Sequence, residues 1–193
     1  ELYNTVVSVI TLDINPSIKL ELDKDSNVIN MIALNEDAKD IVLSNYEGNS
    51  LESVINDVTN KLIEKGYAQD KLVILVGTSG TITSDEVKDL IDKKLTTNNI
   101  DYSVIIPKIS DTSSKLAKEY NITESKAAYL EEVIKNNSNL KIEDIKDMSM
   151  ILLIKLMKQL KIILMTISKI LVKVLITVAD MVVYLNAIML GLP

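Results

Sequence analysis

The chain has 193 residues, a formal net charge of −6, and neither cysteine nor histidine. Its length suits one ordinary domain with room for an appendage. Without cysteine or histidine it has no disulfide framework, thiol nucleophile or imidazole base, and we expect no metal and no cofactor. All 21 basic residues are lysines. Bidentate arginine contacts to phosphate are therefore excluded, and with the negative charge this argues against nucleic acid as a partner.

The stretch from residue 5 to residue 34 predicts a β-meander. Apolar and polar residues alternate from Val7 to Leu22, a polar turn follows at residues 23–27, and Val28 to Leu34 forms a third apolar run. Three strands joined by short turns pair antiparallel and pack one face against helices. Asn15-Pro16 interrupts the first run, because proline has no N–H to give to a sheet. The simplest interpretation of this pair is a kink or tight turn between two strands.

From residue 35 to residue 148 the pattern alternates between helix and strand. Ser50 is an expected N-cap, Thr83-Ser84-Asp85-Glu86 is a capping box, and Thr123 is a further expected cap. The predicted elements are a short helix opening at Asn35, a helix from Leu51 to Lys65, a strand from Lys71 to Val76, a helix after Thr83, a strand from Tyr102 to Pro107, two helices between Asp111 and Asn136, and a short helix from Lys141 to Met148. The predicted fold class is α/β (α+β): an N-terminal antiparallel meander extended by βαβ-like elements into a sheet covered by helices.

Residues 149–193 have a different composition and form the second predicted domain, after residues 1–148. No acidic residue occurs between Asp147 and Asp180, and the polar residues follow one stripe of a helical wheel. We predict an amphipathic helical tail, with lysines too frequent for a clean transmembrane span and with an uncharged run, Met181 to Pro193, that is too short for one. The alternative is that this tail is translated out of frame in an AT-rich gene, which the encoding DNA would decide.

Three other features are weaker site candidates. Gly77-Thr78-Ser79-Gly80-Thr81 lies between a predicted strand and a predicted helix, but lacks the Gly-Lys-Ser/Thr ending of a phosphate loop. We predict an ordinary loop there, with a nucleotide-binding enzyme as a third functional hypothesis. Glu131-Glu132 and Glu143-Asp144 are adjacent in sequence and point in different helical directions, which is typical of solvated faces. The tyrosines are scattered and predict no stacking platform.

Asn15-Pro16 carries the most specific chemistry. Ordinary asparagine deamidation needs the N–H of the next residue, and proline has none. The side-chain nitrogen of Asn15 can instead attack its own main-chain carbonyl, close a succinimide and expel the nitrogen of Pro16. Strain of a few kcal/mol is typical of functional backbone, and donors to the developing oxyanion would supply further rate. Asp13 and Ser17 are near enough in sequence to assist.

The stretch Val9-Ile10-Thr11-Leu12-Asp13-Ile14-Asn15-Pro16-Ser17-Ile18-Lys19-Leu20-Glu21-Leu22 resembles the extracytoplasmic domain of RsgI-type anti-sigma factors. The similarity continues through Ala33-Leu34-Asn35-Glu36-Asp37-Ala38-Lys39 and Ile63-Glu64-Lys65-Gly66-Tyr67, and covers about residues 5 to 148. The resemblance implies that the domain breaks its Asn-Pro bond by itself. Asn15 would cyclise and Pro16 would become a new N-terminus, with Asp13 and Ser17 completing the catalytic motif.

The resemblance also implies a cellular role. In such a protein a cytoplasmic segment holds a sigma-I-type factor, one transmembrane helix follows, and this domain lies on the extracytoplasmic side. Separation of the two halves would expose the membrane-bound piece to an intramembrane protease, which frees the sigma factor. An extracellular polysaccharide or another ligand is a candidate stimulus. We expect this chain to be a piece that lacks the sigma-binding segment and the membrane segment, and to be at most a single-turnover autoprotease. The alternative is a non-cleaving binding or adhesion module in which Asn15-Pro16 is only a β-kink.

Overall fold

The computed structural model describes residues 5–69, 71–137 and 139–190. Residues 191–193, the end of the uncharged run noted above, lie outside this description. The chain divides into two compact units, Glu1–Leu153 and Ile154–Pro193, and each is described by itself. The first unit is a five-stranded mixed sheet with helices, as the predicted α/β class requires.

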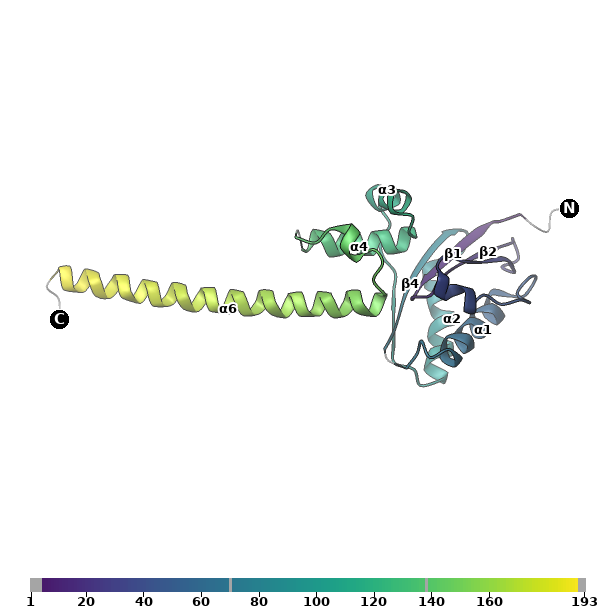
Figure 1. The fold of residues 1–193 in the computed structure, drawn as a ribbon, viewed down its shortest axis with the longest axis horizontal. Helices are drawn as coiled ribbons and strands as arrows, with labels where there is room; N and C mark the ends of the chain where they lie inside the picture. Colours follow the sequence, from purple (N-terminus) through teal and green to yellow (C-terminus); the bar gives the residue numbers. More distant parts are fainter. Residues whose placement is uncertain (1–4, 70, 138, 191–193) are drawn as a thin grey trace. The chain divides into compact units, whose positions relative to one another are not determined.

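The strands occur in the spatial order β3-β2-β1-β4-β5, which places β1 in the middle of the sheet (Figure 1). Pairing is antiparallel for β1 with β2, β1 with β4 and β2 with β3, and parallel for β4 with β5. The predicted meander and its extension are thereby confirmed. The strands are β1 (Ser8–Asp13), β2 (Ser17–Leu22), β3 (Val28–Ala33), β4 (Leu72–Gly80) and β5 (Tyr102–Ile105). The helices are the 3-10 helix η1 (Glu36–Asp40), α1 (Leu51–Glu64), α2 (Ser84–Thr97), α3 (Asp111–Tyr120), α4 (Glu124–Lys135), α5 (Ile142–Ile145) and α6 (Met150–Met189).

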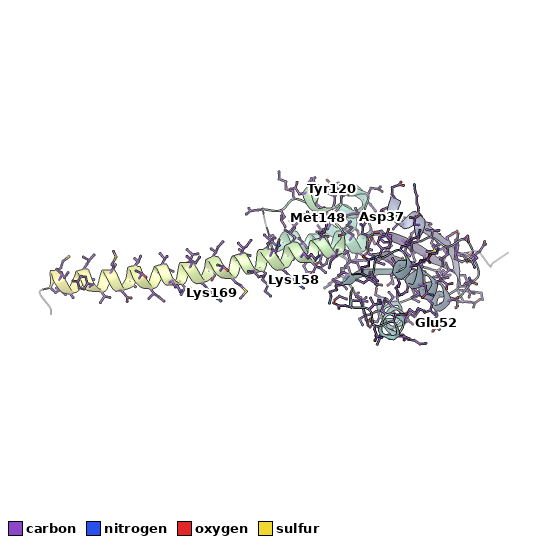
Figure 2. All side chains as sticks on the ribbon, turned by 60° about the horizontal axis from the view of Figure 1, so that its bottom comes forward. Asp37, Glu52, Tyr120, Met148, Lys158 and Lys169 are labelled. Atoms are coloured by element: carbon purple, nitrogen blue, oxygen red, sulfur yellow. The ribbon has the colours of Figure 1, made fainter. Side chains whose placement is uncertain are left out.

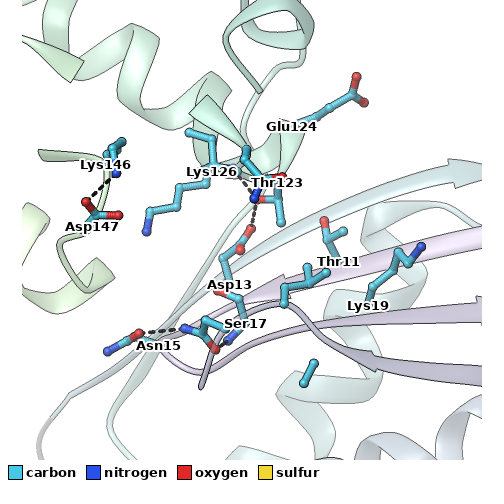
Figure 3. Close-up of a pocket in the computed structure, with 15 residues that line it drawn as sticks. Thr11, Asp13, Asn15, Ser17, Lys19, Thr123, Glu124, Lys126, Lys146 and Asp147 are labelled. Carbon is cyan, nitrogen blue, oxygen red and sulfur yellow. Dashed lines mark hydrogen bonds and ion pairs between the residues drawn. The ribbon is translucent and has the colours of Figure 1, made fainter. Parts of the chain in front are cut away.

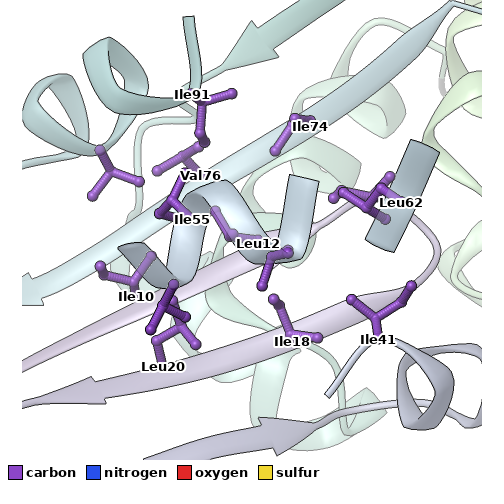
Figure 4. Packing of buried hydrophobic residues seen from close by; sticks show 14 of the residues in the cluster. Ile10, Leu12, Ile18, Leu20, Ile41, Ile55, Leu62, Ile74, Val76 and Ile91 are labelled. Atoms are coloured by element: carbon purple, nitrogen blue, oxygen red, sulfur yellow. The ribbon is translucent and has the colours of Figure 1, made fainter. Parts of the chain in front are cut away.

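One face of the sheet carries the main hydrophobic core under α1 and α2 (Figure 4). Ile10 and Leu12 of β1 point into this core, and side chains of β2, β4 and both helices surround them. The labelled core residues are Ile10, Leu12, Ile18, Leu20, Ile41, Ile55, Leu62, Ile74, Val76 and Ile91, all at most 3% exposed. Full burial of one such side chain contributes about 1.5–3 kcal/mol. Burial of side chains on this face therefore helps to hold β1 in place, in addition to its pairing with β2 and β4.

The opposite face of the sheet receives α4. Gly77 of β4 allows the close approach, because a Cβ there would lie 2.7 Å from Thr11 Oγ1 and 3.0 Å from Ser125 Cβ. The Thr11 and Ser125 hydroxyl oxygens lie 3.0 Å apart across this contact. The start of α4 is thus seated directly on β1 and β4, beside the end of β1.

The predicted helix caps are confirmed. The Ser50 side chain accepts from the Ser53 N–H at the start of α1, and Thr83 and Glu86 form both halves of a capping box at α2. The Thr123 hydroxyl accepts from the Lys126 N–H at the start of α4. These local signals fixed where the helices begin.

The prediction of a loop at residues 77–81 is wrong for most of its length. β4 continues through Gly80, with Thr11 opposite Gly77 and Ser8 opposite Gly80 in the β1–β4 ladder. Glycine has low strand propensity, and pairing with β1 overrides it here at Gly77 and Gly80. A strand occupies the place where a phosphate loop would have to be, so the nucleotide-binding hypothesis loses its structural basis.

The second unit is the main part of α6. The large apolar side chains from Ile162 to Leu190 are 47–82% exposed, and Figure 2 shows Lys158 and Lys169 projecting from the same helix. α6 is long and apolar enough to cross a membrane. The expectation that the chain contains no segment suited to a membrane span is therefore wrong. The separate lysines do not prevent this, because a long lysine side chain can extend along a helix toward water.

Candidate functional site at the Asn15–Pro16 turn

The Asn15–Pro16 bond lies in the hairpin that joins β1 to β2. Asp13 and Ser17 are the last paired residues, so the loop is Ile14-Asn15-Pro16. The Ile14 N–H donates to the Pro16 carbonyl oxygen at 2.9 Å and closes the loop. Ile14 and Pro16 are buried, whereas Asn15 is exposed. The peptide bond between Asn15 and Pro16 is cis. The pair thus forms a tight turn in which Asn15 alone is exposed to solvent.

Asn15 adopts a left-handed backbone conformation, with φ of +82°. Asparagine tolerates this region better than most residues, yet a non-glycine residue held there costs about 1–3 kcal/mol. The following proline restricts the same residue further. Such a conformation persists only when the surrounding contacts impose it.

The Asn15 side chain is held by Asn35, which follows β3. Asn35 Nδ2 donates to Asn15 Oδ1 at 3.0 Å, and Asn35 Oδ1 accepts from the Ser17 N–H at 3.0 Å (Figure 3). Among the residues that the structure describes, none accepts a hydrogen bond from Asn15 Nδ2. The amide oxygen of Asn15 is therefore fixed, while its nitrogen has no partner in the part of the chain that the structure describes.

Asp13 is buried at the end of β1, with only 2% of its surface exposed. Its Oδ2 accepts from the Thr123 hydroxyl at 2.5 Å and from the Ser125 hydroxyl at 2.6 Å, both at the start of α4. Its Oδ1 is the one buried side-chain nitrogen or oxygen in the described ranges that has no partner. Burial raises the pKa of Asp13 above its ordinary value, although the Ser125, Thr123 and Ser17 hydroxyls and the Lys126 ammonium partly oppose the rise.

A polar hollow of about 650 Å³ opens beside these groups. It is bordered by the end of β1, the start of β2 and the start of α4, and both charged termini of Lys126 and Asp147 face it (Figure 3). A second hollow of about 310 Å³ reaches Asn15 from the side of Ile14 and Tyr67. Water and small solutes can therefore reach the turn from two directions.

The four residues predicted for the site, Asp13, Asn15, Pro16 and Ser17, lie together at one end of the β1–β2 hairpin. Sequence reasoning missed Asn35, Thr123 and Ser125, which complete the contacts. The sequence marked Asn35 and Thr123 only as helix N-caps. That role accounts for the two residue types and gives no sign of their contacts with Asn15 and Asp13. Glu131 and Glu143 lie elsewhere: Glu131 accepts from Ser110 at 2.7 Å, and Glu143 accepts from Tyr120 at 2.7 Å.

Fold and site together define a class: a small α/β domain with a strained asparagine–proline turn built into its central hairpin. Residues 7–132 match the family described as the anti-sigma factor RsgI-like central domain. The chain belongs to this family, and the resemblance drawn from the sequence is confirmed.

Individual relatives agree with the family match. The chain is 30% identical over 95 residues to the anti-sigma-I factor RsgI of Bacillus subtilis, a match covering 48% of this chain and 25% of that protein. It is 26% identical over 153 residues to RsgI4 of Acetivibrio thermocellus, covering 73% and 29%, and 22% identical over 139 residues to RsgI7 of the same organism, covering 68% and 26%. The matched part is only about a quarter of the length of each relative.

Proposed function

We propose that this domain is the sensor and transducer domain of an RsgI-type anti-sigma factor and that it cuts its own chain between Asn15 and Pro16. One observation carries the proposal: Asn15 directly precedes proline at φ of +82°, with its side-chain oxygen held and its nitrogen unengaged by described residues. Family membership supports the regulatory role. The strained turn supplies the chemical reason for a cut at this bond rather than at another.

The cut is a ring closure. Asn15 Nδ2 bonds to the Asn15 carbonyl carbon, the bond from that carbon to the Pro16 nitrogen breaks, Nδ2 loses a proton and the Pro16 nitrogen gains one. The products are a chain ending in a succinimide and a chain beginning with Pro16. No water is consumed until the succinimide hydrolyses. Positioning can contribute much of the rate, since well-oriented intramolecular reactions avoid most of the entropy cost of bringing groups together.

Asp13 and Ser17 are assigned supporting roles in this step. The unpaired Oδ1 and raised pKa of Asp13 suit a group that accepts a proton. The Ser17 hydroxyl, on the strand after the cut, contributes to the environment of the Asp13 carboxyl.

The fold can keep the two halves together after the cut. β1 pairs with β2 over six positions and with β4 over six more. Each net hydrogen bond contributes about 0.5–1.5 kcal/mol, so the association is durable and still yields to force or to a ligand that disturbs the sheet. In this proposal the domain lies outside the membrane, and separation of its halves lets an intramembrane protease act and frees a sigma-I-type factor. An extracellular polysaccharide is one candidate stimulus.

The intact mass of the purified chain tests self-cleavage. We expect two fragments, one ending at Asn15 and the other beginning at Pro16. Their summed mass should equal that of the uncut chain before the succinimide hydrolyses, and should exceed it by one water afterwards. Asn15→Ala should abolish the split. The control is Asn121→Ala, which also replaces an asparagine with positive φ but one that does not precede proline. A wild-type chain that keeps its full mass after long incubation would refute the proposal.

The competing function is a non-cleaving binding module in which Asn15-Pro16 is only a turn. The polar hollow beside the turn favours this candidate to the extent that it offers a binding surface. The same mass measurement separates the two functions, because the binding module predicts a single uncut species.

A further inference from the structure

We propose that Asn35 is a positioning residue for the self-cleavage, and that it sets the amide of Asn15 in the orientation from which the nitrogen can attack. This inference rests on the proposed function. It concerns a residue 20 positions away in sequence, at the N-cap of η1.

The Asn35 carboxamide contacts both sides of the Asn15–Pro16 bond. Its Nδ2 donates to the Asn15 side chain before the bond, and its Oδ1 accepts from the Ser17 N–H after it. The same Oδ1 also accepts from the Ala38 N–H at 3.1 Å. One planar group therefore spans the bond that would break.

Asn35 is itself fixed by the surrounding backbone. The Leu34 N–H donates to the Ser17 carbonyl oxygen at 2.9 Å, which ties the end of β3 to the start of β2. Ala38 is fully buried and anchors the first turn of η1. Asn35 thus extends from rigid elements on both of its sides, as a group that positions another should.

Backbone groups also settle which way the two amides face. The Ser17 and Ala38 N–H groups can only donate, so the Asn35 atom that they share must be its oxygen. The Asn35 nitrogen then faces Asn15 as a donor, so the Asn15 atom that accepts from it must be the side-chain oxygen. With that oxygen held by Asn35, the Asn15 nitrogen is the end of the amide left free to turn toward the main-chain carbonyl.

The hydrogen bond also favours the chemistry. Donation to Asn15 Oδ1 draws electron density away from Nδ2 and makes its hydrogens easier to remove. Nδ2 must lose a proton as the new bond to the carbonyl carbon forms and the bond to the Pro16 nitrogen breaks. Asn35 therefore combines orientation with polarisation of the attacking group.

Asn35→Asp isolates this role. Aspartate keeps an acceptor for the Ser17 and Ala38 N–H groups and is as good an N-cap as asparagine, but its carboxylate has no proton to donate to Asn15. The full chain is made in a short pulse of cell-free synthesis, and cutting is followed in time by denaturing gels and intact mass. At neutral pH we expect the variant to be cut on the order of 100-fold more slowly than wild type. As the pH falls through the pKa of the introduced carboxyl the donor returns, so the variant rate should rise relative to wild type.

Two further variants secure the result. Asn49→Asp makes the same substitution at a side chain that bonds to the Asn45 carbonyl oxygen and not to the β1–β2 turn, and should be cut at the wild-type rate. Asn35→Ser keeps a neutral N-cap but is too short to contact Asn15, and should be cut slowly at every pH. If Asn35→Asp fails to fold, the rate of Asn35→Ser alone tests whether Asn35 positions Asn15. Wild-type rates in both Asn35 variants would overturn the role of Asn35 and leave self-cleavage intact, whereas an uncut wild type would overturn self-cleavage itself.

Discussion

The turn between β1 and β2 and the turn between β2 and β3 join strands of one sheet, but the side chains that hold them come from different places. In the β2–β3 turn the side chain is local: Asp23 Oδ1 accepts from the Asp25 and Asn27 N–H groups, each at 2.9 Å. In the β1–β2 turn, besides the backbone bond from Ile14 to Pro16, the side chain is that of Asn35, which lies beyond the next strand. A turn whose side-chain amide is held from a distance indicates a requirement beyond chain reversal.

The carboxylates beside the two turns differ in the same way. Hydrogen bonds from the Asn27 backbone, and further ones from its side chain and from the Asp25 backbone, lower the pKa of the half-buried Asp23. Burial raises the pKa of Asp13. The surroundings of Asp23 therefore stabilise its charged form, whereas the buried surroundings of Asp13 disfavour its charged form. Perturbation of this second kind is the one associated with functional sites.

Pro16→Ala should produce the largest effect, because it changes the chemistry of the bond at the β1–β2 turn. The bond becomes a secondary amide, and the new alanine N–H can attack the Asn15 side chain. We expect slow deamidation of an uncut chain instead of cleavage, visible as ammonia loss and hydrolysis in intact mass spectra. If this variant were cut as quickly as wild type, the β1–β2 turn would not owe its cleavage to the proline, and the proposed difference between the two turns would be wrong.

Ser125→Ala should have a smaller effect that is still easily measured. It removes a hydroxyl that donates to Asp13 Oδ2 and leaves a buried carboxylate with one donor fewer. We expect the free energy of unfolding to fall by about 1–3 kcal/mol, measured by urea denaturation in an Asn15→Ala background so that the chain is uncut.

Ser113→Ala is the matched control for that experiment. Ser113 is equally buried, but its hydroxyl bonds to the Ser110 backbone within α3 and does not reach β1. It should lower stability without changing the titration of Asp13. A Ser125 variant that also left that titration unchanged would contradict the placement of Asp13 against α4.

Asp13→Asn and Asp23→Asn should give the smallest effects. Each should change how the free energy of unfolding varies with pH, and the two changes should have opposite signs. The folded chain keeps the Asp13 proton to a higher pH than the unfolded chain, so the Asp13 contribution to stability falls as pH rises from its ordinary pKa through its raised one. The Asp23 contribution is present above its ordinary pKa and is lost as pH falls through its lowered one. Urea denaturation of uncut chains between about pH 3 and pH 7 should show both trends relative to wild type. Slopes of the same sign would contradict the contrast between the two sites.

The sequence was sufficient wherever the determining signal was local. Alternation predicted the three strands of the meander, the proline marked the turn at Asn15, and Thr83 with Glu86 marked the start of α2. The extension of β4 through Gly80 was missed, because it depends on pairing with β1 rather than on the residues themselves.

The candidate site divides in the same way. Asn15 and Pro16 were identified because their chemistry depends on adjacency, which a sequence displays directly. Asn35 was visible only as the start of a helix, and its second contact depends on how β3 returns beside β2. Thr123 and Ser125 reach Asp13 across more than 100 residues. No periodicity or spacing in the chain encodes a contact of that kind.

Under the proposed function, the central place of β1 in the sheet would limit how often one molecule can respond. If β1 leaves after a cut, the sheet is divided into the pair β3-β2 and the pair β4-β5, because the removed strand was their only link within the sheet. Return would require a separate strand to enter between two exposed edges in the correct register. Each molecule would therefore report one event and then have to be replaced by synthesis. The size of a response would count the molecules consumed, rather than the fraction occupied at any moment.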